Sequence, residues 1–254
     1  MNWAARRRFI ILLIIGAIVV AFFATVLIAT FSKTPTCSDN IQNQDETGVD
    51  CGGSCAYLCS EQQRPPTVLF TKAISNGKGR TDVVASIENV NASAAARNVP
   101  YTVTLYGARQ AFVQEVTGTI DLPPFATIPI YIPGIPSGNQ DVVRAFFSID
   151  PASPQWFAMA NDMRAKPVVS NTIMSGTASA PRIDATLTNG GVTALSNVRV
   201  IILVRDAQGE VMTASQTIVP AISAQGQATA TFTWNTAFPN MPVAIEVLPV
   251  IPLP

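Results

Sequence analysis

An apolar run extends from Phe9 to Phe31 and contains no charged residue. A helix rises about 1.5 Å per residue and a bilayer core is about 30 Å thick, so roughly 20 apolar residues span it. The core helix of a soluble protein is seldom this long and this uniformly apolar. The sequence therefore predicts a transmembrane helix over residues 9–31, with all later residues on one side of the membrane.

Basic residues indicate the direction of this span. The arginines before it are Arg6, Arg7 and Arg8, and only Lys33 follows it closely. Arginines near a span resist translocation, so we expect a cytoplasmic tail at residues 1–8 and an extracytoplasmic region at 32–254 of a single-pass membrane protein. A cleaved signal peptide is the alternative, but its apolar region normally has about 7–15 residues and a small-residue cleavage site. The longer run, without a clean Ala-x-Ala after it, favours an uncleaved anchor.

Charge is unevenly distributed, although the formal net charge is +0. Residues 1–36 carry four bases and no acid, residues 37–60 carry four acids and no base, and the remainder carries twelve of each. Neither half has the basic patch that binding to phosphate backbones requires, which argues against a nucleic-acid partner. The expected partners are the lipid bilayer and a protein or another component of the cell envelope.

All four cysteines lie within 23 residues, at Cys37, Cys51, Cys55 and Cys59. A segment this short cannot bury a core, and an even number of cysteines outside the membrane is typical of a disulfide framework. We therefore predict two disulfides, with three pairings open. A zinc site with four thiolate ligands is the alternative reading of the same spacing.

The same segment is rich in carboxylates without compensating bases. They are Asp39, Asp45, Glu46 and Asp50, and two amides, Asn40 and Asn43, accompany them. Oxygen ligands at this density suit Ca²⁺, which would be the only cofactor that we expect. A solvated acidic loop is the plainer interpretation of these residues.

Residues 37–59 resemble a recurring extracellular cysteine-rich motif, Cys-x-Asp/Asn-x3-Asn-x2-Glu-Thr-Gly-x-Asp-Cys-Gly-Gly-x-Cys-x2-3-Cys. The matching residues are Asn43, Glu46, Thr47, Gly48, Asp50, Cys51, Gly52, Gly53, Cys55 and Cys59. The resemblance implies a secreted or surface location and implies no enzymatic activity. Independently of it, Gly52 and Gly53 predict a turn that needs positive φ.

Beyond Pro65 the chain consists of short alternating stretches separated by Gly, Pro, Asn and Ser, which predicts β-strands. The clearest stretches are residues 83–89, 101–106, 126–132 and 142–149. A break at Asp150–Pro154 follows, and then the pattern starts again. Ile87-Glu88-Asn89 returns as Leu187-Thr188-Asn189, an offset of one hundred residues.

This repeat predicts an all-β extracytoplasmic region. We expect a cysteine-rich segment at residues 32–63 and two tandem immunoglobulin-like β-sandwiches at 64–150 and 151–254, each with about seven short strands. Asn89 and Asn189 end corresponding strands, where an amide can bond the backbone of the following turn.

The second copy contains the segment IDATLTNGGVTALSNVRVIILVRDAQGEV. Here a strand ends in Asn, a loop of small residues follows, Asn-Val opens the next strand, and a hairpin contains Asp and Gly. This order resembles the bacterial extracytoplasmic modules with a Phe-x-Leu-Tyr-Asp strand motif and the related adhesion-type CARDB modules. Neither copy has the full motif: the strand ends Val204-Arg205-Asp206 here and Leu105-Tyr106-Gly107 in the first copy. The resemblance covers residues 65–250 and implies a bacterial membrane-anchored surface protein.

Both faces of one strand in the second copy are apolar. Val198, Val200, Ile202 and Val204 should face the core of the sandwich. Ile201 and Leu203 would lie on the opposite face, which predicts that the first sandwich covers it. Trp156 and Phe157 fall between the copies, where they could wedge the two domains or begin the second one.

The sequence gives no indication of catalysis. The chain has no histidine, so Ser-His-Asp and Cys-His arrangements and the usual zinc triads are excluded, and bridged cysteines supply no thiolate nucleophile. We therefore expect no catalytic residue. The predicted function is a non-enzymatic anchored protein that presents its sandwiches for binding or spacing of envelope components; the alternative is a structural subunit of a secretion or pilus-like assembly.

Overall fold

The structure is a computed structural model that describes residues 3–31, 36–77, 79–138, 140–160 and 162–254. Lys33, used above for orientation, lies outside the described residues. Residues 1–55 and 56–254 form two compact units, which are described separately. The chain is mostly β, with 50% of residues in strands and 12% in helices.

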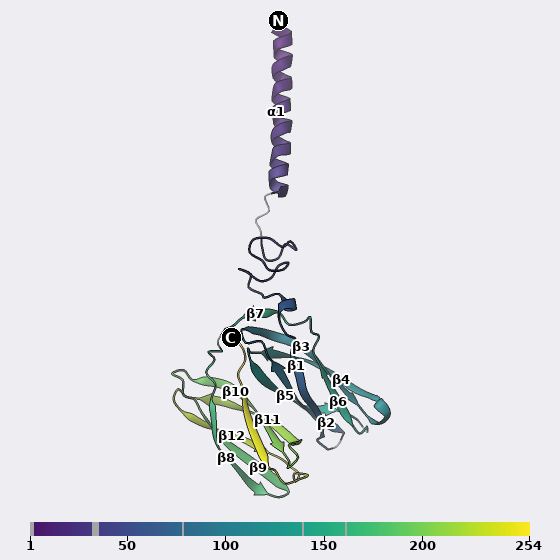
Figure 1. Ribbon diagram of the computed structural model, residues 1–254, viewed down its shortest axis with the longest axis vertical. Coiled ribbons are helices and arrows are strands. Elements are labelled where there is room, and N and C mark those ends of the chain that lie inside the picture. The colour runs from purple at the N-terminus through teal and green to yellow at the C-terminus, as the bar shows by residue number, and fades with distance from the viewer. Residues whose placement is uncertain (1–2, 32–35, 78, 139, 161) are drawn as a thin grey trace. The chain divides into compact units, whose positions relative to one another are not determined.

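A single long helix, α1 (Trp3–Phe31), covers the predicted span (Figure 1). It begins six residues before Phe9, so the three arginines lie within its first turns. Its most apolar part is Arg6–Ile28, 23 residues, none of which is buried within the protein. The helix is long and apolar enough to cross a bilayer, a criterion that a signal sequence also meets.

Residues 56–254 fold into β-sandwiches, as the all-β prediction requires. The first sandwich contains β1 (Thr67–Ser75), β2 (Arg80–Asn89), β3 (Ala94–Tyr106), β4 (Phe112–Leu122), β5 (Ala126–Pro136), β6 (Arg144–Ser148) and β7 (Trp156–Ala158). The second contains β8 (Val168–Thr177), β9 (Ala180–Thr188), β10 (Leu195–Arg205), β11 (Val211–Ile222), β12 (Gln227–Thr233) and β13 (Ala244–Val250). Two short 3₁₀ turns are η1 (Ser60–Gln62) and η2 (Ala108–Gln110).

Both sandwiches have the same topology. In the first, the sheets are β1-β2-β5 and β4-β3-β6, and in the second they are β8-β9-β12 and β11-β10-β13. Strands β1 to β6 therefore correspond in order to β8 to β13, and β7 is an addition that pairs with β3. The repeat in the sequence is thus a repeat of structure, with six corresponding strands rather than about seven.

Each sandwich has its own core, built by alternation along the strands. In β10, Val200, Ile202 and Val204 point inward and are 0% exposed. In the first sandwich, Ile87 of β2 and Leu105 of β3 are equally buried. The predicted register of β10 is confirmed.

The two strand-ending asparagines are buried and make equivalent hydrogen bonds. Asn89 and Asn189 are each 1% exposed. The Nδ2 of Asn89 donates to the carbonyl oxygen of Pro123 at 2.7 Å, and that of Asn189 donates to Ser223 at 3.0 Å. In both cases the acceptor lies 34 residues further along the chain. The amides therefore hold the turn regions of each sandwich together, as the sequence indicated.

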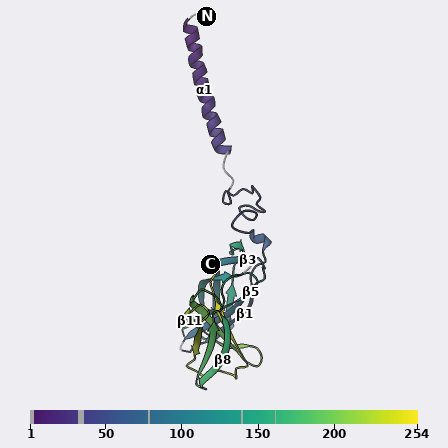
Figure 2. The same cartoon turned by 90° about the vertical axis from the view of Figure 1, so that its left-hand side faces the viewer.

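The outer face of sheet β1-β2-β5 packs against the outer face of sheet β11-β10-β13. A third apolar cluster fills this junction, and its buried members are Val84, Ile201, Leu203, Val211 and Ala214. Figure 1 shows the two sandwiches side by side, and in Figure 2, seen from the left of that view, β8 of the second sandwich faces the viewer. The prediction that the first sandwich covers Ile201 and Leu203 is confirmed.

Polar contacts border the apolar junction. The Arg205 guanidinium lies 5.5 Å from the centre of the Phe70 ring, a cation–π contact between the sandwiches. Near the other end, the backbone N–H of Leu253 donates to Asp121 Oδ2 at 2.8 Å. The C-terminal segment, which follows β13 of the second sandwich, is therefore hydrogen-bonded to the first sandwich.

Ion pairs and a hydrogen bond also hold the linker between the sandwiches in place. Arg164 forms an ion pair with Asp162 at 2.7 Å and donates to the carbonyl oxygen of Ile251. Lys166 contacts the same carboxylate at 2.6 Å. The hydrogen bond from Arg164 holds the pKa of the Asp162 carboxyl well below its usual range. These contacts join the linker to the C-terminal segment.

Trp156 belongs to the first sandwich, although the predicted boundary placed it at the start of the second. In β7 it pairs with Ala96 of β3, and its side chain is 1% exposed within the first core. The chain therefore completes the first sandwich after the Asp150–Pro154 break. Burial of a large indole is the physical reason, because the core of that sandwich has room for it beside the small residues of β3.

The register of β10 makes a stability prediction. Replacing Ile202 by alanine leaves a cavity in the second core, so the free energy of unfolding should fall by about 2–5 kcal/mol. Replacing Arg199, an exposed side chain on the other face of the same strand, should change it far less. Denaturant titration of both variants is the measurement, and equal losses would contradict the assigned faces.

Candidate functional site

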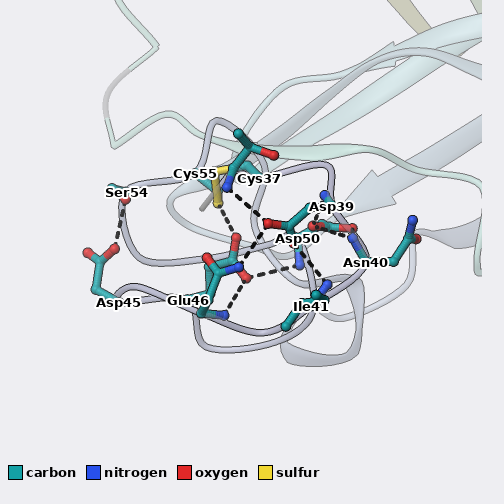
Figure 3. Close-up of a disulfide and its surroundings, with 11 residues drawn as sticks. Cys37, Asp39, Asn40, Ile41, Asp45, Glu46, Asp50, Ser54 and Cys55 are labelled. Atoms are coloured by element: carbon teal, nitrogen blue, oxygen red, sulfur yellow. Dashed lines mark hydrogen bonds between the residues drawn. A yellow bond between two sulfur atoms is a disulfide. The ribbon is translucent and has the colours of Figure 1, made fainter. Parts of the chain in front are cut away.

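The cysteine-rich loop at residues 37–59 is closed by disulfides. Cys37 and Cys55 are joined, with an S–S distance of 2.05 Å (Figure 3). Cys51 and Cys59 are disulfide-bonded as well, and no described cysteine is free. This agrees with the predicted pair of disulfides and selects a partner for Cys37. Bonded sulfurs do not serve as thiolate ligands, so the zinc interpretation does not describe this structure.

Two glycines make the tight turn between the cysteines. Gly52 and Gly53 have φ of 75° and 57°, as the sequence predicted. A Cβ on Gly52 would lie 1.9 Å from Thr47 Oγ1, and one on Gly53 would lie 2.1 Å from the carbonyl oxygen of Asp45. The loop therefore needs glycine at both positions for space as well as for backbone conformation.

Three of the four carboxylates belong to one hydrogen-bonded network. Buried Glu46 accepts the backbone N–H groups of Asn43 at 3.2 Å and Asp50 at 3.3 Å. Asp50 in turn accepts the N–H groups of Asp39 and Asn40, each at 3.0 Å. These acids satisfy backbone donors that a loop without regular secondary structure would otherwise leave unpaired.

Asp39 completes this network, whereas Asp45 lies apart from it (Figure 3). Asp39 accepts the N–H of Ile41 at 3.0 Å and the side-chain amide of Asn43 at 2.9 Å. Asp45 accepts the Ser54 hydroxyl at 2.7 Å, and this bond lowers the pKa of its carboxyl. The structure thus brings together Asp39, Glu46 and Asp50 of the predicted calcium ligands, and calcium binding stays a prediction.

Glu46 also lies beside the disulfide. Its Oε1 is 3.2 Å from the sulfur of Cys55, and Cys37, Glu46 and Cys55 form a compact group. Because both sulfurs are oxidised, this contact is not a hydrogen bond from a thiol and the group lacks the ligands of a metal centre.

A second candidate surface was not identified from the sequence. At one end of the first sandwich, a hollow of about 530 Å³, here called the tip hollow, is lined by Tyr106, Arg109, Gln110, Val143, Arg144 and Phe146, among others. Phe146 is 52% exposed and Val143 is 68% exposed. Phe112, 60% exposed, stands opposite Tyr106 on β4. The apolar pair Phe146-Phe147 was the available signal, since alternation must turn one ring outward.

The hairpin beside the tip hollow is strained. Arg109 has φ 56° and ψ 28°, and Gln110 has φ 62°. Positive φ at both central residues is type I′ turn geometry, which favours Asn-Gly or Gly-Gly. A side chain in the left-handed region costs roughly 1–2 kcal/mol per residue. The corresponding β10–β11 hairpin instead uses Gly209, with φ 79°.

Comparisons with known proteins leave the family open. No protein-family model and no curated protein matches this sequence. A transglutaminase structure from red sea bream aligns at 10% identity with a TM-score of 0.23, over 75% of this chain and 30% of that one. A β-glucuronidase of glycoside hydrolase family 2 aligns at 9% identity with a TM-score of 0.23, over 83% and 26%. The chain spans less than a third of either structure, and scores this low support no inference about activity.

The disulfide assignment can be tested directly. Peptide mapping of unreduced protein should recover a linked pair containing Cys37 and Cys55, because these sulfurs are bonded. The intact mass should be four hydrogens below that of the reduced chain, as two disulfides require. Four free thiols with bound zinc would contradict the assignment.

The calcium prediction concerns the full chain in lipid nanodiscs. Extracellular calcium modules bind with dissociation constants of about 10⁻⁴–10⁻³ M, so calorimetry should detect binding in that range, weakened by Asp50→Asn. Asp141→Asn, a change of an exposed acid outside the loop, is the matched control. Absence of heat up to about 10 mM calcium, above that range, would leave these acids as acceptors of backbone hydrogen bonds only.

Proposed function

We propose that this chain is a non-enzymatic, single-pass membrane protein with a cytoplasmic N-terminus, which presents two β-sandwiches outside the membrane for binding or spacing of envelope or extracellular components. The observation that carries the proposal is α1. None of the 23 residues of Arg6–Ile28 is buried within the protein. Exposure of so much apolar surface to water is unfavourable by about 25 cal/mol per Å², and a bilayer removes that cost.

The cysteine-rich loop supports an extracytoplasmic location for the rest of the chain. Disulfides persist in oxidising compartments and are rare in the cytosol of most organisms. Arg6–Arg8 at the start of α1 favour retention of that end in the cytoplasm. The loop and the arginines therefore favour the same topology.

The junction between the sandwiches supports presentation and spacing. A shared apolar cluster and the contacts of the C-terminal segment join the two sandwiches into one body, which suits a rigid spacer. An open apolar strip at this junction would favour the alternative function, a subunit of a secretion or pilus-like assembly. Within the described residues, Ile201 and Leu203 are 2% exposed, because the first sandwich covers them.

Topology and anchoring can be tested in cells that express the full chain. Protease added outside wall-permeabilised cells should remove the sandwiches and spare a small membrane fragment, and the intact chain should resist extraction by alkaline carbonate. Replacing Arg6–Arg8 by glutamine should reduce the fraction with this orientation. Protection of the whole chain would contradict the orientation, and a mature N-terminus beyond Phe31 would contradict the anchor.

A further inference from the structure

We propose that the tip hollow docks a protein segment that carries carboxylates around an aromatic or large apolar side chain. This proposal rests on the proposed function in one respect, namely that the sandwiches present binding surfaces. It deepens that function by giving the place and the chemistry of the partner.

The first step is the arrangement of the aromatic rings, of which Phe146 is exposed and Tyr106 is half-buried. Tyr106 and Phe146 meet edge to face with their centres 5.8 Å apart, and the Arg144 guanidinium lies 5.8 Å from the centre of Phe146. Phe112 is exposed opposite Tyr106. The rings support one another, so a partner would lose little side-chain entropy by packing against them. An exposed aromatic cluster of this kind marks an interaction surface.

The second step is charge. Arg109 and Arg144 are among the residues lining the hollow, and the described lining includes no acidic residue. A guanidinium binds a carboxylate through two parallel hydrogen bonds, and it gains more where water is partly excluded. A complementary segment therefore places its apolar side chain in the hollow and its carboxylates at the two arginines.

The third step is the strained hairpin. Arg109 and Gln110 occupy left-handed conformations, while the same hairpin of the second sandwich has a glycine at its positive φ. The strained pair stands directly in the lining of the hollow. Strain retained at such a position points to a use for the side chains that cause it.

The fourth step is placement along β3. The chain enters the sandwich pair beside the start of this strand, where the N–H of Leu58 donates to the carbonyl oxygen of Trp156 at 2.7 Å and Trp156 pairs with Ala96. Tyr106 lies ten residues further along β3, or about 33 Å at the usual rise per residue. The hollow thus lies at the end of β3 opposite to Trp156, on the same sandwich.

A protein fits the hollow better than an acidic polysaccharide does. Arginine and aromatic side chains are enriched in protein–protein interfaces and at their energetic hot spots. Val143 and Phe146, which line the hollow, have no side-chain donors or acceptors for sugar hydroxyls. The apolar content of the site therefore selects a partner with an apolar side chain of its own.

The test uses the full chain in lipid nanodiscs and a fluorescent peptide with phenylalanine between two pairs of glutamates. Anisotropy should report binding that weakens with salt. Two control peptides, one with lysines for the glutamates and one with alanine for the phenylalanine, should bind much more weakly. Polygalacturonate is the polysaccharide probe and should compete poorly.

Matched variants locate the binding. Arg109→Gln and Phe146→Ala, both in the lining, should each weaken the peptide complex about tenfold, the effect of one interface hot spot. Arg80→Gln removes an exposed arginine, and Phe125→Ala removes an exposed ring, both outside the hollow, and neither should change affinity. Replacing Arg109-Gln110 by Asn-Gly should raise the melting temperature by about 2–4 °C while weakening binding.

Several results would overturn the proposal. They are absence of peptide binding, equal binding of the lysine peptide, unchanged affinity in the Asn-Gly variant, or stronger competition by polygalacturonate than by unlabelled peptide. The assay does not depend on topology in cells. A failure here therefore leaves the membrane-anchor proposal standing, and a failed protease experiment leaves the peptide result interpretable.

Discussion

The structure depends on two strands that are apolar on both faces. In β2, Val83 points into the first core and Val84 points out of it; in β10, Ile202 points inward and Ile201 points outward. A sandwich can bury only one face of each strand, so the other faces need a cover. Each sandwich covers the other, which yields four stacked sheets. The linker and the C-terminal segment lie beside this junction, and hydrogen bonds from Arg164 and Leu253 hold them there.

The repeated asparagines are a polar contact that the two sandwiches share. Few side chains are identical between the two sandwiches, yet Asn89 and Asn189 make bonds to backbone carbonyls at the same separation along the chain. Each amide is enclosed by the turns that it connects. A residue without an amide there would leave buried carbonyl groups unpaired, at a cost of about 1–3 kcal/mol per group. The buried apolar residues at Ile87 and Leu187 differ between the two sandwiches, whereas this polar position is the same in both.

Much of this fold follows from local patterns. A long uncharged run predicts α1, alternation gives the faces of β10, and paired cysteines predict a disulfide loop. Patterns of this kind predict which way a side chain points, but they do not predict which residue it contacts in the folded protein. Trp156 was assigned past the first sandwich for that reason: a break in the chain precedes it, and the cavity that accepts it is formed by β3, about sixty residues earlier. The partner of Cys37 likewise depends on how the loop folds around Glu46.

The tip hollow could not be predicted from the sequence for a further reason, which a comparison of the two sandwiches explains. Sequence patterns identify positive φ through glycine, as at Gly209, which has φ 79°. Arg109 and Gln110 have the backbone conformation of a type I′ turn without the residues that signal it. Since the second copy reaches a closely related hairpin at lower conformational cost, topology does not require the strained version. The fold itself therefore does not explain why Arg109 and Gln110 have positive φ. A role of these two side chains at the surface of the first sandwich would explain it. In a repeated domain, a non-glycine residue with positive φ therefore indicates a functional position when the other copy forms the corresponding turn with less strain.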